Sequence, residues 1–291
     1  MMTDPLAAGE RIRVVTSTFE RVRYREELVL RSPRLRALVE DLAPPVLFRG
    51  YLRIQSRVAQ QIWARDIYDK HFDIDWYKIN FNRIAVINLL CAGQQSPAYL
   101  EIGCRDNDCF DAIIAKDKIG VDPERGGTHR LTSDKFLSEC GDKTFDVIFI
   151  DGLHTYEQVR RDIVNSLEHI STRGWIVLHD MFPRNWFEAH VPHIPEISND
   201  WSGDVWKVGF ELARSPDLDF RILKIDRGVG VLRVTKKNPD IPDLLSELRG
   251  KQFRYFYENV RHLPVLDYEC GRAWIESCLR ERSKVVEATS N

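Results

Sequence analysis

The apolar residues of this chain follow two different spacings, and the change comes near residue 96. Before it, apolar residues recur at helical spacing in three segments, 34–42, 51–68 and 82–91, with Pro44-Pro45 as a break after the first. After it come short, continuously apolar runs at 98–102, 118–121, 145–150 and 175–178. Such runs are typical of parallel strands that are covered on both faces. The pattern therefore predicts helices first and an α/β sheet next.

Two further runs, 220–225 and 229–234, are separated only by Asp226-Arg227-Gly228. A tight turn that contains glycine favours an antiparallel hairpin, placed here at the end of a doubly wound α/β sheet. Helical spacing resumes at 241–260 and 270–282. We therefore predict an N-terminal helical extension over 1–95, an α/β core over 96–236 and C-terminal helices over 237–291.

Composition excludes several classes of protein. Apolar residues make up 43%, charged residues 30%, and the formal net charge is −2. That balance gives no general attraction for nucleic acid or for an anionic membrane. No apolar run is long enough to span a membrane, and the N-terminus lacks a signal-peptide core, so we expect a cytoplasmic protein. The six cysteines lack metal-site spacing and are expected to be reduced thiols.

Acidic residues stand at or just beyond the ends of four predicted strands: Glu101, Asp122, Asp151 and Asp180. The carboxyl ends of parallel strands meet at one edge of the sheet, where open α/β sheets bind their ligands. We therefore expect these four side chains to gather around one site.

The turn after the first strand contains Gly103, which permits close backbone approach to a ligand. Arg105 and Asn107 stand where further glycines are common in cofactor-binding turns of this kind, and Asn107 tolerates a left-handed backbone. The missing glycines disfavour a nicotinamide-dependent oxidoreductase, which stays an alternative because Asp122 also suits a ribose.

The most specific segments are FDVIFI at 145–150 with DGLHTYE at 151–157, and GWIVLHD at 174–180. They resemble the bacterial methyltransferase family 24, a group of class I S-adenosylmethionine-dependent enzymes that includes sugar and natural-product O-methyltransferases. The resemblance covers about 82–234 and implies a mostly parallel, seven-stranded, Rossmann-like sheet that ends in a hairpin. It also implies S-adenosylmethionine as cofactor, with these candidate contacts: Glu101, Gly103 and Arg105 for methionine and ribose, Asp122 for ribose, Ser133 and Asp134 for adenine. For Ser133 the alternative is helix capping.

Methyl transfer to a hydroxyl requires that the hydroxyl lose its proton. A general base that titrates near neutrality can accept the proton, and His154 is the candidate base. A divalent cation can lower the pKa of the hydroxyl, and Asp151 and Asp180 are hard oxygen ligands suited to Mg²⁺, with His179 as a candidate third ligand. The alternatives are that Asp151 only turns the chain and that His154 bonds locally at a helix start.

The segment 183–208 is rich in Pro, Trp and His, and such long connections often line a pocket. From it we take Trp206, Lys207 and His193 as candidate acceptor contacts. We predict an O-methyltransferase that acts on a saccharide, either an oligosaccharide or a glycosylated metabolite. The alternatives are a catechol or phenol acceptor and a non-catalytic cofactor-binding module. The N-terminal helices suit either a pocket cap or a homodimer interface.

Overall fold

The structure, a computed structural model, describes residues 57, 61–194 and 200–289, and side chains as far as residue 281. It divides into two compact units: residues 1–69 with 192–200, and residues 70–191 with 201–291. In the first unit, 61–63 is a helical turn, and the Ile67 amide after it donates to the Trp63 carbonyl. The predicted helix 34–42 and half of 51–68 lie outside the described residues. Among those residues, none of the helices combines the length and apolarity that crossing a membrane requires.

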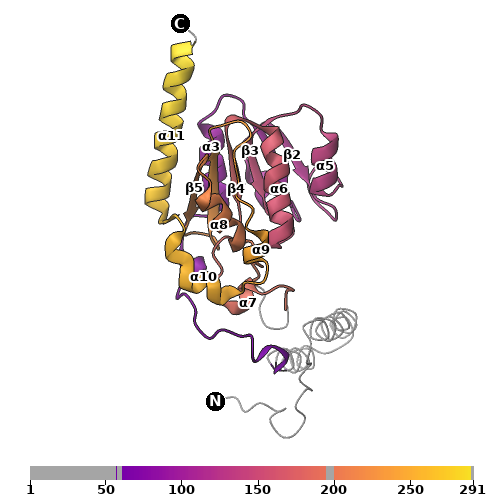
Figure 1. Ribbon diagram of the computed structural model, residues 1–291. Helices are drawn as coiled ribbons and strands as arrows, with labels where there is room; N and C mark the ends of the chain where they lie inside the picture. Colours follow the sequence, from indigo (N-terminus) through magenta and orange to yellow (C-terminus); the bar gives the residue numbers. More distant parts are fainter. Residues whose placement is uncertain (1–56, 58–60, 195–199, 290–291) are drawn as a thin grey trace, which may run out of the picture. The chain divides into compact units, whose positions relative to one another are not determined.

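Within the described residues, the second unit contains one seven-stranded sheet in the order β2-β1-β3-β4-β6-β5-β7 (Figure 1). The strands are β1 Ala98–Ile102, β2 Asp117–Val121, β3 Phe145–Ile150, β4 Ile170–Leu178, β5 Leu218–Leu223, β6 Val229–Val234 and β7 Val265–Leu266. The pairs β2-β1, β1-β3 and β3-β4 are parallel, whereas β6 runs antiparallel to β4 and β5. The predicted mostly parallel, seven-stranded sheet with a final hairpin is confirmed.

The hairpin turns where the sequence predicts it. Asp226, Arg227 and Gly228 all have positive φ, the conformation that lets two strands reverse over a short connection. The seventh strand has a different origin, because β7 lies between the C-terminal helices and pairs in parallel with β5 at the sheet edge. A two-residue strand carries too little periodicity for the sequence to show it.

Helices cover both faces of the sheet (Figure 1). On one face, α3 and α11 contact each other and pack with Val147, Phe149 and Val231 in a shared apolar core. Because successive side chains of a strand point to opposite faces of the sheet, the strands also present apolar residues to the other face. There α6 contacts β3 and β4, and α8 contacts β5. The helices are α3 Arg83–Ala92, α4 Asp108–Ala112, α5 Ser133–Glu139, α6 Tyr156–His169, α7 Trp186–Ala189, α8 Trp206–Arg214, α9 Leu245–Leu248, α10 Phe253–Asn259 and α11 Tyr268–Thr289. Two 3₁₀ turns, η1 Trp76–Lys78 and η2 Val260–His262, join them.

One predicted helix is wrong in extent. The segment 241–260 forms two short helices, α9 and α10, which are separated around Gly250. Glycine and the extended Gln252 interrupt the helical backbone there. The division of the chain at residues 95 and 236 stays a prediction, although α3 and the C-terminal helices contact the sheet within the same unit.

Candidate active site

A cavity of about 790 Å³ opens at the carboxyl ends of β1 to β4. Its lining includes all four acidic residues that the sequence places at the strand ends, Glu101, Asp122, Asp151 and Asp180. Ligand pockets of about 300–1,000 Å³ hold small molecules, so this one has room for a cofactor and part of a second molecule. The expectation that the acids gather at one site is confirmed in geometry.

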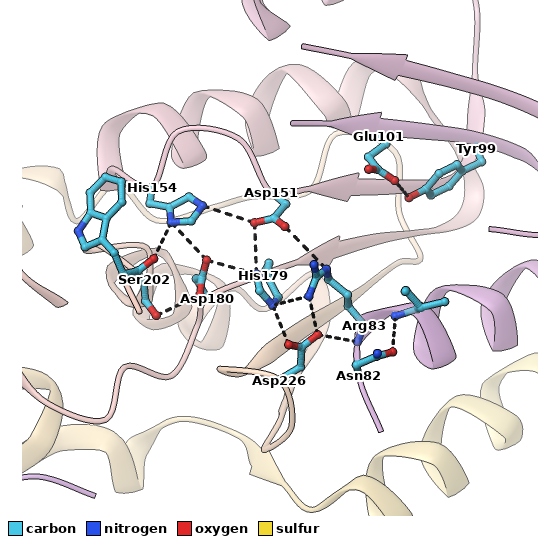
Figure 2. A network of polar contacts seen from close by, with 12 residues as sticks. Asn82, Arg83, Tyr99, Glu101, Asp151, His154, His179, Asp180, Ser202 and Asp226 are labelled. Atoms are coloured by element: carbon cyan, nitrogen blue, oxygen red, sulfur yellow. Dashed lines mark hydrogen bonds and ion pairs between the residues drawn. The ribbon is translucent and has the colours of Figure 1, made fainter. Parts of the chain in front are cut away.

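Two carboxylates and two imidazoles form the polar centre of this cavity (Figure 2). His154 Nε2 lies 3.5 Å from Asp151 Oδ1, and His154 Nδ1 lies 3.3 Å from Asp180 Oδ2. His179 Nδ1 lies 3.2 Å from each of the same two oxygens. Asp151 and Asp180 follow neighbouring parallel strands, which is why residues so far apart in the chain meet here.

A carbonyl oxygen fixes the tautomer of His154. Its Nδ1 lies 3.0 Å from the carbonyl of Trp201, which only accepts hydrogen bonds, so Nδ1 carries a proton. In the neutral ring, Nε2 therefore holds the lone pair. This atom is the one that can take a proton or bind a cation.

His179 is held differently, through two residues that the sequence analysis did not select. Its Nε2 lies 3.5 Å from Asp226 Oδ1, in the β5–β6 turn. Arg83, at the start of α3, forms a 2.9 Å ion pair with Asp226 and lies 3.8 Å from Asp151. Nδ1 of His179 therefore faces carboxylates, whereas Nε2 faces both Asp226 and, at 3.5 Å, Arg83 Nη1.

The charges of this cluster shift the pKa values of its members. Burial lowers the pKa of His154. The charge of Asp180 and the contacts of Asp151 outweigh this effect of burial and raise the pKa to about 9. Burial also lowers the pKa of His179, but the charges of Asp151 and Asp180 outweigh burial and raise this pKa well above its ordinary value. Against burial, the charge of His179 lowers the pKa of both Asp151 and Asp180. The two aspartates are therefore ionised and electrostatically suited to a cation.

Residues 201–204 clamp the His154 loop in place. The Trp201 ring stacks on the His154 ring at 5.1 Å, and the Ser202 hydroxyl donates to Asp180 Oδ1 at 3.0 Å. A Cβ on Gly203, whose φ is +61°, would lie 1.8 Å from the His154 carbonyl. Asp204 Oδ1 accepts from the Tyr156 amide and so holds the start of α6. The sequence offered no periodic signal for this clamp.

Gly103 follows β1, and the chain after β3 passes so close to it that only glycine fits. Its φ is +91°, and a Cβ there would lie 2.2 Å from the Asp151 carbonyl. Glu101 is buried beside it and accepts a 2.6 Å hydrogen bond from the Tyr99 hydroxyl. In Figure 2 this pair lies apart from the His–Asp centre. Burial raises the pKa of Glu101 to about 7, against the opposing hydrogen bond from Tyr99.

Asp122, at the end of β2, is bound by backbone amides. Its carboxylate accepts from the amides of Glu124, Arg125 and Arg105, and these bonds overcome burial to lower its pKa. A carboxylate has about four acceptor positions, so about one remains for a ribose hydroxyl. The Arg105 side chain points outward to Asp106. Asn107 adopts the left-handed backbone, as predicted.

Ser133 and Asp134 open α5 at the cavity wall. The helix cap is Thr132, whose hydroxyl accepts from the Lys135 amide, so the alternative of Ser133 as the cap is wrong. Ser133 instead donates a 2.6 Å hydrogen bond to Asp162, a buried acid on α6 that the sequence analysis did not select.

Two of the predicted acceptor contacts, Trp206 and Lys207, do not line this cavity. Trp206 is fully buried among Phe210, Tyr255 and Phe256 and does not line the cavity, so this assignment is corrected to a packing role. Lys207 is also buried, bonded to Asp204 and to the Arg249 carbonyl, because an ammonium removed from water requires such partners. His193 belongs to the other compact unit, so its assignment stays a prediction.

Residues 88–181 match a family model described as a methyltransferase domain, family 24. Solved structures with a similar fold include the SAH-bound methyltransferase PaMTH1 of Podospora anserina, at 16% identity and TM-score 0.40, with 70% of this chain and 95% of that one covered. Another is the Bacillus cereus O-methyltransferase in complex with SAH, at 15% identity and TM-score 0.39, with 69% and 97% covered. A search of curated proteins finds no match.

The family match defines the class of domain that this chain contains: a methyltransferase domain at residues 88–181, within a sheet of order β2-β1-β3-β4-β6-β5-β7. The match at these residues agrees with the family that the sequence motifs indicate.

Proposed function

We propose that this enzyme is an O-methyltransferase that moves the methyl group of S-adenosylmethionine to a hydroxyl of a saccharide. The observation that carries the proposal is the convergence of Asp151, His154 and Asp180 at one end of the cavity. Two acids and an imidazole suit the removal of a proton from a hydroxyl. An amine acceptor already has a free lone pair and would not need this removal.

The cofactor residues are proposed from their positions in the cavity. Glu101 and Gly103 line it at the end of β1, where the resemblance places the methionine part and the ribose. Asp122 offers its remaining acceptor position to a ribose hydroxyl, and the Arg105 backbone steadies that carboxylate. When bound, S-adenosylmethionine supplies an electrophilic methyl group on its sulfonium. The chain supplies no phosphate-binding glycine loop, which fits a cofactor without phosphate.

A divalent cation fits the same end of the cavity. Ligand atoms of Asp151, His154 and Asp180 all lie within 4.8 Å of one another. Carboxylates are the ligands that Mg²⁺ prefers, and such a cation, when bound, lowers the pKa of a coordinated hydroxyl. Of the two imidazoles, His154 is preferred to the expected His179 as the neighbouring nitrogen, because His154 belongs to this trio of ligand atoms and His179 does not.

His154 Nε2 has two candidate roles. As a general base it accepts the hydroxyl proton in the neutral ring, which the raised pKa of about 9 makes the minor form at neutral pH, in contrast to the expected base that titrates near neutrality. The Trp201 carbonyl holds the proton on Nδ1, so Nε2 is the accepting atom and the ring cannot turn without losing this bond. Stacking on Trp201 fixes the ring plane as well. A ligand role for Nε2 would exclude proton transfer by the same atom.

A saccharide suits the lining of the cavity better than a catechol. Among the described residues that line it, Trp201 is the only Trp, Tyr or Phe, and charged side chains predominate. A flat aromatic acceptor needs apolar walls, whereas a sugar needs hydrogen-bond partners and one stacking ring. The catechol or phenol alternative is kept because vicinal hydroxyls of either acceptor can approach a cation.

An acceptor screen tests the proposal. Transfer of radioactive methyl from S-adenosylmethionine is measured with methyl glycosides, oligosaccharides, catechols and amines, each with EDTA and after Mg²⁺ is restored. We expect turnover with a saccharide, loss with EDTA and recovery with Mg²⁺. Turnover confined to catechols would select the alternative acceptor, and turnover confined to amines would overturn O-methylation.

Glu101 offers a test of the cofactor assignment that also reads out stability. Its pKa rises from 4.5 to about 7 on folding, so its ionisation opposes folding increasingly from pH 4.5 to 7. We expect Glu101→Gln to stabilise the cofactor-free protein at pH 8 by at most about 3 kcal/mol, with the gain vanishing near pH 4.5. Because the ionised carboxylate would pair with the ammonium of the methionine part, affinity for S-adenosylhomocysteine should fall at least about tenfold.

Thermal unfolding at both pH values and calorimetric titration of S-adenosylhomocysteine measure these effects. Tyr99→Phe is the matched control, because it removes only the hydrogen-bond donor to Glu101 and keeps the charge. A Glu101→Gln protein that binds S-adenosylhomocysteine as tightly as the wild type would remove Glu101 from the cofactor site.

A further inference from the structure

Asp162 is a buried acid on α6 that lines the cavity and has no role in the reaction described above. The residue is 1% exposed, and no ion pair to it is present among the described residues. Burial raises its pKa to about 6, against the opposing hydrogen bonds from Ser133 and Gln158. Burial of an ionisable group lowers the stability of the protein unless favourable interactions compensate, so the presence of Asp162 at the cavity suggests a function.

Only one of the two carboxylate oxygens of Asp162 is used by the protein. Oδ1 accepts from the Ser133 hydroxyl at 2.6 Å and from Gln158 Nε2 at 2.9 Å. No residue that the structure describes donates a hydrogen bond to Oδ2. The two bonds to Oδ1 fix the plane of the carboxylate, and Oδ2 is left as an acceptor beside the cavity that the residue lines.

Next to Oδ2 the chain keeps space open. Gly152 lines the cavity, and a Cβ built on it would lie 3.5 Å from Ile102 Cγ2 and 4.0 Å from Asp162 Oδ2. This glycine has no positive φ that would require it for conformation. Any larger residue would place its side chain between Ile102 and Asp162, so Gly152 leaves room for a flat group there.

The neighbouring acid Asp134 is a weaker candidate for the same role. Its side chain is 47% exposed and lies 3.8 Å from Arg161, and its oxygens accept from Gln158 and Asn165. Exposed carboxylates that already have partners discriminate little between ligands, whereas a buried acceptor with an unused position discriminates strongly.

We propose that Asp162 Oδ2 accepts a hydrogen bond from the exocyclic amino group of adenine, with the ring lying over Gly152, and so selects an amino-bearing nucleobase. This inference rests on the proposed use of S-adenosylmethionine and replaces Asp134 by Asp162 as the acid that contacts the base. Ser133 then contributes indirectly, by holding the carboxylate in place.

The test compares S-adenosylhomocysteine with its deaminated analogue, S-inosylhomocysteine, by calorimetric titration at pH 8, where Asp162 is ionised. The analogue carries a carbonyl oxygen where adenine has the amino group, so it would face the carboxylate as a second acceptor. We expect the wild type to prefer S-adenosylhomocysteine by about a hundredfold or more. Asp162→Asn, whose amide can donate to the carbonyl, should reduce that preference to below about tenfold.

Two further variants complete the experiment. Glu168→Gln removes an exposed charge from the same helix and should keep the wild-type preference. Asp134→Asn tests the rival acid, and a loss of preference there but not in Asp162→Asn would overturn the proposal. A wild type that binds both compounds equally would also overturn it, without any need for a folded variant. Failure to bind S-adenosylhomocysteine at all would instead contradict the proposed function.

Discussion

Replacing His154 by Ala should lower kcat by about 10²- to 10⁴-fold, the usual contribution of a general base, and leave affinity for S-adenosylhomocysteine near the wild-type value. The imidazole lies among Asp151, Asp180 and the Trp201 carbonyl, apart from Glu101 at the end of β1. Loss of the ring therefore removes the accepting nitrogen and spares the proposed cofactor contacts. Single-turnover methyl transfer and calorimetric titration measure the two quantities.

His154→Asn is the sharper variant, because its amide nitrogen can replace Nδ1 as donor to the Trp201 carbonyl and it has no atom in the place of Nε2. The same loss in both variants would locate the function at Nε2. Near-normal turnover in His154→Asn would mean that the residue only holds residues 201–204 in place. Wild-type turnover in His154→Ala would remove it from the role of base.

The Mg²⁺ dependence of the residual activity separates the two roles of Nε2. If His154 is the base, the half-saturating Mg²⁺ concentration should stay within about twofold of the wild-type value in both variants. A rise of tenfold or more would make His154 a metal ligand, since a lost protein ligand typically weakens metal binding by at least that factor. Proton transfer would then need another acceptor.

Much of the fold follows from the sequence because its signals are local. Continuous apolar runs that end in acids mark β1, β2, β3 and β4, and parallel strands necessarily bring their carboxyl ends to one edge. The same reasoning places Asp151 and Asp180 together before any coordinates exist. Strand β7 escapes it, because two residues at a sheet edge are defined by their pairing with β5 and not by periodicity.

The site residues that the sequence did not indicate depend on contacts between distant segments. Arg83 and Asp226 meet at His179 across 143 positions of sequence, and Trp201 approaches His154 through irregular backbone. For Lys207 the error is the opposite one, because the sequence suggested a site residue that the structure does not place in the cavity. A lysine in a loop-rich segment suggests an exposed ligand contact, yet α8 buries it against Asp204. Sequence shows which residue types are present but not which partner satisfies each one once it is buried.

Removal of the Asp180 carboxylate should lower kcat by at least about a hundredfold and abolish the response to Mg²⁺. Asp180 lies two residues beyond the end of β4; its Oδ2 faces both His154 and His179, and its Oδ1 accepts from the Ser202 hydroxyl. Asp180→Ala also adds backbone strain, because φ at this position is +59° and Ala tolerates the left-handed region less well than Asp. Asp180→Asn keeps the shape and tolerates this backbone, so it isolates the loss of charge.

Asp226→Asn is the matched comparison for Asp180→Asn, because it changes a carboxylate that contacts the other side of His179 without belonging to the trio of ligand atoms. We expect this variant to keep a Mg²⁺ response even where its kcat falls, whereas Asp180→Asn should show the same residual rate with EDTA and with Mg²⁺. A Mg²⁺ response that survives in Asp180→Asn would remove Asp180 as a ligand. If the wild type itself ignores chelators, the charges of Arg83 and His179 must suffice to balance Asp151 and Asp180, and the reaction would depend on His154 alone.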